Sequence, residues 1–505
     1  MDVSSVSNGP YSSAARTRCL MHERAPFHIK ALHGFTGSVG NLVFVVFELF
    51  VLFFYQRVVG LDGRLVGLAI FISLVVDALT DPVIGDWSDR LRARFGRRHT
   101  MMFGSVLPMG LFFFLQFTPP AGLSQQGLFL WLLVMSVGAR VMLTFFDAPA
   151  AAVTAEVAVR PADRAEMGIY RQVAGLVAYL GVLYLAFSVF FSATESFPVG
   201  QENPAAYAPF GAAAAIALMV FMIVASAGTY RHIRRFEDSL PPPSRTRFDW
   251  MKTLRSWGEL ILQVRNTRAL FWGLLLATTM GSCFRSLNLH FGPYLWGLTT
   301  EQMQAWQQAV PYGMLAAAVG ARFIVTRTEP KYLYLTGYTI LLTSYVAPLF
   351  LTLLGLLPEF GSGALAGVLF GFQLAAGLGA GLLMICSLIM FAETTDEYRF
   401  VRNVSRTALI LGLITFGNKL ASGLGKVVSG WILEWVGFPD VKSGVEVTPQ
   451  VASDLALYAG VFCAIAGLAG LAVLSTFRLT RARHAEIVAG LRERDGMMQT
   501  EASSG

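Results

Sequence analysis

The stretch LVGLAIFISLVVDALTDPVIG, residues 65–85, decides the fold class and the first functional hypothesis. It is long and apolar enough to cross a bilayer, because about 20 residues of helix span the hydrocarbon core. Yet it contains Asp77 and Asp81, one helical turn apart. A charged side chain at that depth costs at least about 2.5–3.5 kcal/mol on insertion scales, so such residues are expected to serve a function. The pattern therefore predicts a transmembrane helix that carries a cation site.

The composition extends this interpretation to the whole chain. Of 505 residues, 54% are hydrophobic and 14% are charged, whereas soluble domains carry roughly 25% charged residues. Apolar stretches long enough to cross a bilayer recur throughout. We predict an all-α membrane protein with twelve transmembrane helices, with eleven or thirteen as alternatives at the two long segments 362–392 and 403–436. The spans are 35–58, 64–85, 100–117, 127–154, 168–192, 208–228, 269–291, 302–326, 333–354, 362–392, 403–436 and 453–478.

Basic residues concentrate after span 2, between spans 6 and 7, and after span 12. Basic loops stay on the cytoplasmic side, so both termini are expected in the cytoplasm. These loops explain the net charge of +7, so no nucleic-acid partner is expected. The four cysteines show no metal or disulfide spacing, and no cofactor is expected.

A long polar segment divides the spans into two groups of six, which predicts two pseudo-symmetric bundles around a central cavity. The amphipathic run TLRSWGELILQV in this segment predicts a helix on the membrane surface. The predicted parts are an N-terminal tail (1–30), a six-helix bundle (31–229), a linker (230–268), a second bundle (269–478) and a C-terminal tail (479–505).

Span 2 offers several oxygen donors on one face. Asp77, Thr80 and Asp81 follow i, i+3, i+4 spacing, and Pro82 leaves the carbonyl of Ala78 without its helical partner. Such donors suit Na⁺, bound transiently at Asp77 and Asp81. Close carboxylates also raise each other's proton affinity, so H⁺ is an equal alternative. The structural alternative is one aspartate at a kink and the other in a salt bridge.

Span 4 carries Arg140, Thr144 and Asp147 at i, i+4, i+7 spacing. Thr144 is placed to complete the cation site, and Asp147 to bind substrate or a buried cation. In the alternative interpretation, Arg140 and Asp147 only neutralise each other.

The loop after span 2 reads GDWSDRLRARFGRR (85–98). An acid at a helix end with flanking arginines predicts a breakable latch between helix ends, although arginines there also satisfy the positive-inside rule. The latch residues are Gly85, Asp89, Arg90, Gly96, Arg97 and Arg98, and they resemble the loop signature of the major facilitator superfamily.

Three longer segments make the resemblance more specific. They are DALTDPVIGDWSDRLRARFGRRH (77–99), TFFDAPAAAVTAEV with DRAEMGIYRQ (144–157, 163–172), and TTDEYRF with TFGNKLASGLGKVVSGWILEWVGF (394–400, 415–438). The chain resembles the glycoside–pentoside–hexuronide:cation symporter family over nearly all spans. The resemblance implies a coupling-cation site made by Asp77, Thr80, Asp81 and Thr144.

The same resemblance implies that Asp147 and Arg171 grip a sugar and that Lys419 is a buried lysine near the aspartate pair. An isolated lysine in a membrane is also expected to pair with a carboxylate, and snorkelling to an interface is the alternative. The family often has asparagine at the position of Thr80.

The chain departs from the pattern of the family's melibiose permease at two positions. Asn41 stands where that permease has a sugar-binding aspartate, and Ala151 stands where it has a tryptophan that stacks on the sugar. Both differences argue against galactoside specificity. Glu48 in span 1 and Arg285 in span 7 appear instead, at comparable depth. We expect them to form an ion pair, and anchoring of an anionic substrate by Arg285 is the alternative.

The resulting expectation is a secondary transporter in a bacterial inner membrane, functional as a monomer. Na⁺ or H⁺ drives symport of a small solute, a sugar or glycoside, by alternating access. The rivals are a carrier of lysophospholipid-like or other anionic amphiphiles and a non-transporting sensor or scaffold. An enzyme is not expected, because the chain shows no HExxH, GxSxG or phosphate-binding glycine loop.

Overall fold

The computed structural model describes residues 26–91, 95–158, 160–234, 249–325, 327–402 and 407–504. Within these residues every regular element is helical. The predicted N-terminal tail up to residue 25 and the linker over 235–248 lie outside the described residues.

Each of the twelve predicted spans falls on a helix. The first span consists of α2 (Phe27–Val45), η2 (Val46–Phe50), α3 (Val51–Phe53) and η3 (Phe54–Val59). The next five are α4 (Gly63–Arg90), α5 (His99–Leu115), α6 (Gln125–Val157), α7 (Pro161–Leu185) continued by η4 (Ala186–Phe190), and α8 (Tyr207–Arg234). The last six are α10 (Arg265–Ser286) with α11 (Asn288–Leu295), α12 (Thr300–Ile324), α13 (Pro330–Leu353), α14 (Gly363–Arg402), α15 (Thr407–Trp435) and α16 (Pro449–Ser475).

Eight helices of the described residues are long and apolar enough to cross a membrane, or nine if the pair α10–α11 counts as one span bent by 46°. The other three predicted spans are α5, which has 17 residues, and α12 and α15. The last two are less apolar because α12 opens with TEQMQAWQQ and α15 carries two lysines. Exposed apolar side chains on the spans, such as Leu107 on α5 (73% exposed) and Ile465 on α16 (65% exposed), suit contact with lipid.

The remaining elements are shorter or lie outside the spans. Those are α9 (Trp250–Gln263), α17 (Arg481–Ser504), and the 3₁₀ turns η5 (Gly200–Glu202), η6 (Pro204–Ala206) and η8 (Val441–Ser443). The predicted amphipathic helix is present as α9, whose first turn is capped by Asp249.

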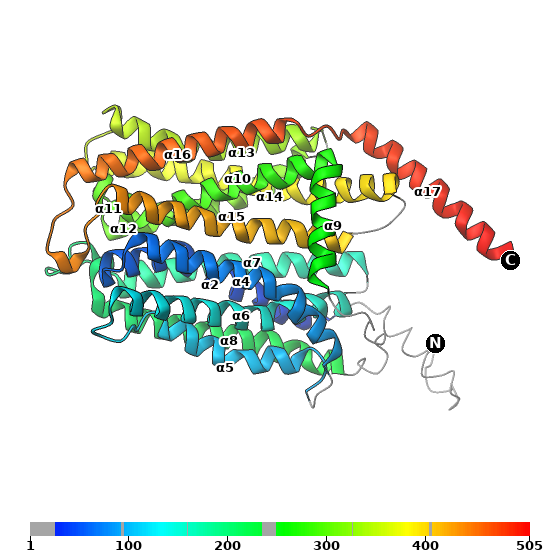
Figure 1. Ribbon diagram of the computed structural model, residues 1–505, viewed down its shortest axis with the longest axis horizontal. Coiled ribbons are helices and arrows are strands. Elements are labelled where there is room, and N and C mark those ends of the chain that lie inside the picture. The colour runs from blue at the N-terminus through cyan, green and yellow to red at the C-terminus, as the bar shows by residue number, and fades with distance from the viewer. Residues whose placement is uncertain are drawn as a thin grey trace. The chain divides into compact units, whose positions relative to one another are not determined.

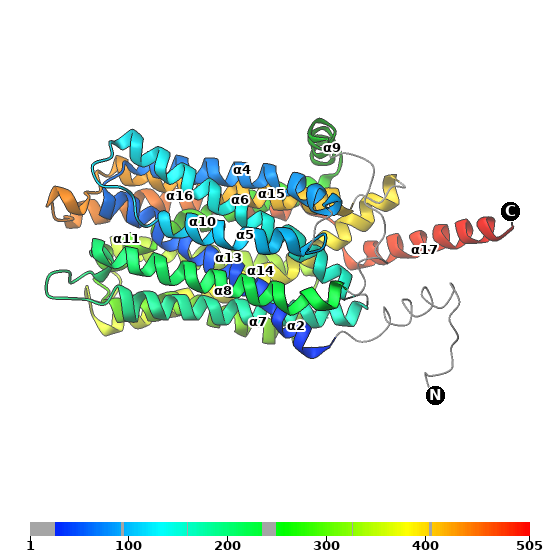
Figure 2. The same ribbon diagram turned by 90° about the horizontal axis from the view of Figure 1, so that it is seen from below.

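The chain divides into two compact units. The first span (α2 to η3, taken as a whole) contributes residues to both units, and so does α4. The first unit comprises residues up to Phe47, 76–190 and 203–248. Here α2 packs against α7 and α8, and α5 packs against α6 and α8 (Figures 1 and 2). A Cβ at Gly37 would lie 1.9 Å from the carbonyl oxygen of Arg171, so only glycine permits this approach of α2 to α7.

The second unit comprises residues 48–75, 191–202 and 249–505. Here α14 packs against α12 and α13, and α10 packs against α15 and α16. Figure 1 shows α9 crossing the long helices of its unit, and Trp257 of α9 donates a hydrogen bond to the carbonyl of Leu409 at 2.9 Å. The α17 helix extends away from these helices in Figure 2.

The first span is not a regular α-helix. It contains two π-helical segments, and Glu48 lies in the middle of the first one, η2. Such segments are rare and occur frequently at functional sites. Glu48 therefore lies at a point where the helix departs from regular α-helical geometry, as residues at functional sites often do.

Candidate functional site

The two carboxylates of α4 meet the hydroxyl of Thr144 from α6. Thr144 Oγ1 lies 2.8 Å from Asp77 Oδ1 and 3.0 Å from Asp81 Oδ1. Asp77 and Thr144 are 3% and 4% exposed, whereas Asp81 is half-buried. The site thus gathers side-chain oxygens from two helices in one partly enclosed place. This is chemistry that suits a hard monovalent cation or a shared proton.

Arg140 lies one turn before Thr144 on the same helix. Its Nη1 is 3.9 Å from Asp77 Oδ2, and its guanidinium stacks over the ring of Phe47 at 4.4 Å. The structure therefore places Arg140 beside Asp77. A positive charge at this distance repels a second cation at the aspartate pair.

Thr80 is oriented differently from the other predicted members of the cation site. Its hydroxyl donates to the backbone carbonyl of Asp77 at 3.1 Å. The hydroxyl that reaches both carboxylates is that of Thr144. Pro82 lies inside α4, which continues to Arg90.

A second charged cluster lies within the second unit, around Glu48. Lys426 Nζ of α15 lies 2.7 Å from Glu48 Oε1, and Ser422 Oγ donates to the same oxygen at 3.2 Å. Arg285 Nε of α10 lies 3.5 Å from Glu48 Oε2. The predicted pairing of Glu48 with Arg285 is therefore present, but Lys426, which we did not predict, is the closer partner.

Burial distinguishes the two cations of this cluster. The side chains of Lys426 and Glu48 are 1% and 6% exposed, while that of Arg285 is 24% exposed. Lys426 also lies 3.3 Å from Ser282 Oγ. The pair Glu48–Lys426 is therefore enclosed, whereas Arg285 is partly accessible.

The other predicted substrate and coupling residues are placed as follows. The Asn41 side chain donates to the carbonyl of Gly37 at 3.0 Å. Asp147 is half-buried on α6, and Arg171 is exposed on α7. Lys419 is half-buried on α15, seven residues before Lys426 and thus on the same face.

Two of the latch residues, Arg97 and Arg98, contact a carboxylate that the sequence did not single out. Arg97 Nη2 and Arg98 Nε each lie 3.2 Å from Glu156 Oε1 of α6. Arg98 also pairs with Asp89 at the end of α4. Arg90 pairs with Asp86 at 2.7 Å within α4.

The two latch glycines differ in their surroundings. Gly96 has φ of +86°, a left-handed conformation that glycine adopts most easily. No neighbouring atom lies within 4 Å of a Cβ placed at Gly85. Gly96 therefore serves the turn that brings Arg97 and Arg98 back to Glu156.

Two further buried ion clusters escaped the sequence analysis. Lys30 Nζ of α2 lies 2.6 Å from Asp163 and 2.5 Å from Glu166, both on α7. In the second unit, Arg57 Nη2 lies 2.5 Å from Glu202, and Arg57 Nε lies 3.0 Å from the Tyr294 hydroxyl. Their signal in the sequence was a charge close to an apolar span, which also fits a side chain that snorkels to water.

Among the described residues, no group of three or more His, Cys, Asp or Glu side chains is arranged to hold a metal ion. The pair Asp77 and Asp81 has a hydroxyl as its third donor instead.

Comparison with known proteins gives a consistent result. A family model described as MFS/sugar transport protein matches residues 32–481. The isoprimeverose transporter of Lactiplantibacillus pentosus is 23% identical over 434 residues, covering 85% of this chain and 84% of that protein. The putative glycoside/cation symporter YagG of Escherichia coli (strain K12) is 24% identical over 442 residues, covering 85% and 87%. The solved structure of a D-xylose-proton symporter matches with a TM-score of 0.59 at 13% identity, covering 88% of this chain and 97% of that one, and shows the same fold.

Proposed function

The chain belongs to the MFS/sugar transport protein family, and from this premise we propose that it is a cation-coupled symporter of a sugar or glycoside. The predicted resemblance to the glycoside–pentoside–hexuronide:cation symporters and the predicted major facilitator fold are confirmed, and the chain is a membrane transporter rather than an enzyme. The coupling ion, the solute and the direction of transport belong to the proposal.

The observation that carries the proposal is the contact of Thr144 with Asp77 and Asp81. It gathers two carboxylates and one hydroxyl from separate helices at 2.8 and 3.0 Å. Two acids held this close favour a cation between them, because a proton or Na⁺ relieves their mutual repulsion. The proposed cargo cation, Na⁺ or H⁺, binds here and leaves with the solute.

Coupling follows if charge decides when the carrier can reorient. With the cation bound, the charge of the aspartate pair is reduced, and the loaded carrier changes from one access state to the other. A carrier with only one of the two ligands does not make this change, so the ion gradient drives solute accumulation. Arg140, 3.9 Å from Asp77, lowers the affinity for the cation and so helps its release.

For the solute we propose Asn41, Asp147 and Arg171 in the first unit as binding residues. Arg285 is proposed as an additional polar contact, held in place by Glu48, since the 24% exposure of the Arg285 side chain leaves it accessible beside the enclosed pair Glu48–Lys426. Asparagine, carboxylate and guanidinium groups offer the donors and acceptors that sugar hydroxyls require. Isoprimeverose and D-xylose are the first solutes to test, because related transporters carry these names.

We place both termini on the cytoplasmic side of a bacterial inner membrane, with the chain acting as a monomer. The basic residues of the latch and of the tail after α16 support this orientation. The latch residues Asp89 and Arg98 would then hold helix ends together on the cytoplasmic side in one access state and separate in the other.

The test is uptake by the full-length protein in proteoliposomes under an imposed Na⁺ or H⁺ gradient. The panel holds isoprimeverose, D-xylose, other glycosides and a lysophospholipid. We expect a saccharide to accumulate with one of the two gradients, and Asp81→Asn to abolish accumulation while solute exchange without a gradient continues. Gradient-driven accumulation by the Asp81→Asn variant would contradict the assignment of Asp81 to the coupling-cation site. Accumulation of the lysophospholipid alone would replace the sugar with an amphiphile.

A further inference from the structure

An open hollow lies in the second unit, where α10 begins and α16 ends. Its volume is about 410 Å³, within the roughly 300–1,000 Å³ that is typical of ligand sites. The lining residues are Arg265, Arg268, Ala269 and Trp272 of α10, with Val473 and Thr476 of α16. The hollow therefore combines two guanidinium groups with a largely apolar wall.

Arg265 and Arg268 are exposed and have no counter-charge. Within the part of the chain that the structure describes, neither side chain has a hydrogen bond or an ion pair. The neighbouring Asn266 is buried, and its amide donates to both carboxylate oxygens of Glu397 at 2.9 and 3.0 Å. The side-chain oxygen of Asn266 accepts the backbone N–H of Arg478 at 3.0 Å. Because Asn266 fixes the start of α10 with this face inward, the two arginines point outward.

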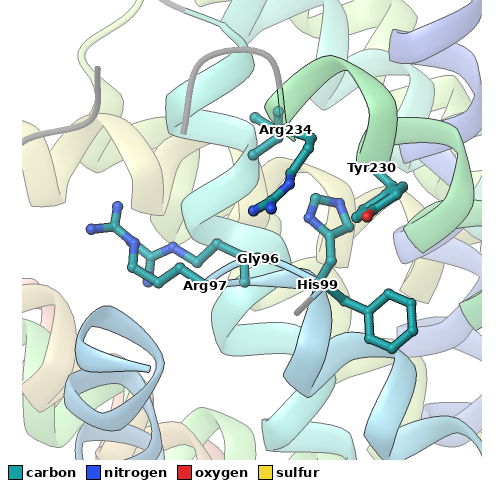
Figure 3. A pocket seen from close by; sticks show the side chains of 8 residues that line it. Gly96, Arg97, His99, Tyr230 and Arg234 are labelled. Carbon is teal, nitrogen blue, oxygen red and sulfur yellow. The ribbon is translucent and has the colours of Figure 1, made fainter. Parts of the chain in front are cut away.

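Arginines also gather where α5 begins and α8 ends, around the space drawn in Figure 3. There Arg97 and Arg98 pair with Glu156, and Figure 3 shows Arg97 extending away from His99. The volume of that space is about 10 Å³, which is room for about one water molecule. The hollow between α10 and α16 differs in both respects, since its arginines are unpaired among the described residues and its volume admits a headgroup.

The apolar wall of the hollow continues along α16 as an exposed surface. Val473 lines the hollow, and Ala469 and Ile465 follow it in two steps of four residues, on one helix face. Both are exposed, Ile465 to 65%. On the α10 side the wall is formed by Trp272, which is 45% exposed, and tryptophan is enriched at the headgroup level of membranes. Two cations, an indole and an aliphatic surface match the polarity of a phospholipid, with its headgroup at the helix ends and its chains along α16.

We propose that this hollow binds the phosphate of an anionic phospholipid between Arg265 and Arg268, with the acyl chains along α16. Guanidinium groups bind phosphate oxygens through paired, charge-assisted hydrogen bonds. A zwitterionic lipid fits less well, because its headgroup brings a cation toward the same two arginines. A soluble phosphate gains nothing from the apolar surface. The bound lipid contacts α10 and α16 together, and these helices pack against each other, so binding should stabilise the folded protein.

The experiment uses full-length protein in a neutral detergent and measures thermal stability during titration with dioctanoyl phosphatidylglycerol. Dioctanoyl phosphatidylcholine and inorganic phosphate are titrated in parallel at the same concentrations. We expect phosphatidylglycerol to raise the Tm saturably, since a ligand that binds the folded state stabilises it, and the other two to have little effect. Equal stabilisation by phosphatidylcholine or by inorganic phosphate would overturn the proposal.

Arg268→Gln should weaken the apparent affinity about tenfold, the usual effect of losing one charge-assisted hydrogen bond. Its Tm without lipid should stay close to that of the unchanged protein, because the Arg268 side chain has no partner among the described residues. Arg231→Gln is the matched control. It removes the same charge from another exposed helix end, in the last turn of α8, and Arg231 does not line the hollow. An equal loss of affinity in both variants would show diffuse attraction and overturn the proposal.

Trp272 gives a second readout, which locates the bound lipid. Bromine atoms on an acyl chain quench the fluorescence of a nearby indole, so brominated phosphatidylglycerol should quench part of the tryptophan fluorescence saturably. Trp272→Phe should lose this saturable part while the rise in Tm persists. Saturable quenching that is unchanged in Trp272→Phe would place the lipid elsewhere and overturn the proposal. Both readouts are taken without any transported solute, so their outcome is independent of the proposed symport.

Discussion

Lys426 Nζ lies 2.7 Å from Glu48 Oε1, and this contact joins residues 378 positions apart in the chain. Both side chains are almost fully buried. Removing one partner of a buried pair leaves an uncompensated charge, which is much more costly than removing both. The contact connects η2 to α15 within the second unit, and its loss should affect stability before it affects any binding step.

Glu48→Gln should therefore lower the free energy of unfolding by about 3–5 kcal/mol. The amide keeps a hydrogen-bond acceptor for Ser422 but leaves Lys426 without its nearest counter-charge. The measurement is thermal or denaturant unfolding of the purified protein in detergent.

The double variant Glu48→Gln/Lys426→Met supplies the control for this prediction. It removes both charges, so we expect it to recover most of the lost stability. Arg285→Gln should have a smaller effect, because that side chain is 24% exposed and lies 3.5 Å from Glu48. Lys426→Met is also measured alone. If its effect on stability and that of Glu48→Gln simply added up in the double variant, the coupling of Glu48 and Lys426 would be refuted.

The fold could be predicted because each span is encoded locally in its hydropathy. The two aspartates could also be recognised, since Asp77 and Asp81 lie one turn apart on one helix and require no tertiary information. Lys426 was missed because its partner is far away in the sequence. A signal did exist: Lys419, Ser422 and Lys426 follow steps of three and four, and a lysine within an apolar span demands a counter-charge.

The spacing of residues along a helix also does not predict the direction in which a hydroxyl points. Thr80 and Thr144 both have the spacing to reach the aspartates. In the structure Thr80 donates to its own helix backbone, while Thr144 reaches both carboxylates. Helix packing, rather than residue type, decides between them.

Thr144→Val should weaken cation binding at the aspartate pair. The isosteric change removes the hydroxyl that contacts Asp77 and Asp81, and losing a hydrogen bond to a charged group weakens binding by about tenfold. The measurement is the cation concentration that half-saturates the rise in Tm, or that half-activates uptake.

Thr144→Ser keeps the hydroxyl and is the matched control, with an expected change of about threefold or less. Thr80→Val removes the other hydroxyl and is expected to change cation affinity less than Thr144→Val does. The reverse order of the two valine variants would assign the ligand to Thr80 instead.

Arg57→Gln should destabilise the second unit by about 2–5 kcal/mol. The Arg57 side chain is 6% exposed and contacts Glu202 at 2.5 Å, the Tyr294 hydroxyl at 3.0 Å and the carbonyl of Pro439 at 2.7 Å. The change leaves the Glu202 carboxylate without its counter-charge, with the Tyr294 hydroxyl still donating to it, and removes the donor of the Pro439 carbonyl. Unfolding of the purified protein in detergent measures the loss.

Arg64→Gln is the comparison for Arg57→Gln at a nearby, exposed ion pair. The Arg64 side chain is 43% exposed and contacts Asp62 at 2.7 Å, so we expect a much smaller loss of stability, because an ion pair in contact with solvent contributes little. Similar losses for the two variants would contradict the assignment of Arg57 as a buried structural centre.

Gly377→Ala and Gly371→Ala, both on α14, should change stability in opposite directions. A Cβ at Gly377 would lie 2.0 Å from the carbonyl oxygen of Val310 on α12, whereas a Cβ at Gly371 meets no atom within 4 Å. The first change forces the two helices apart, at about 1–3 kcal/mol for overpacking. The second lowers the entropy of the unfolded chain and should stabilise by about 0.5–1 kcal/mol. Parallel measurement of Tm decides the matter, and destabilisation of equal size in both variants would show that the close approach of α12 does not explain the glycine at 377.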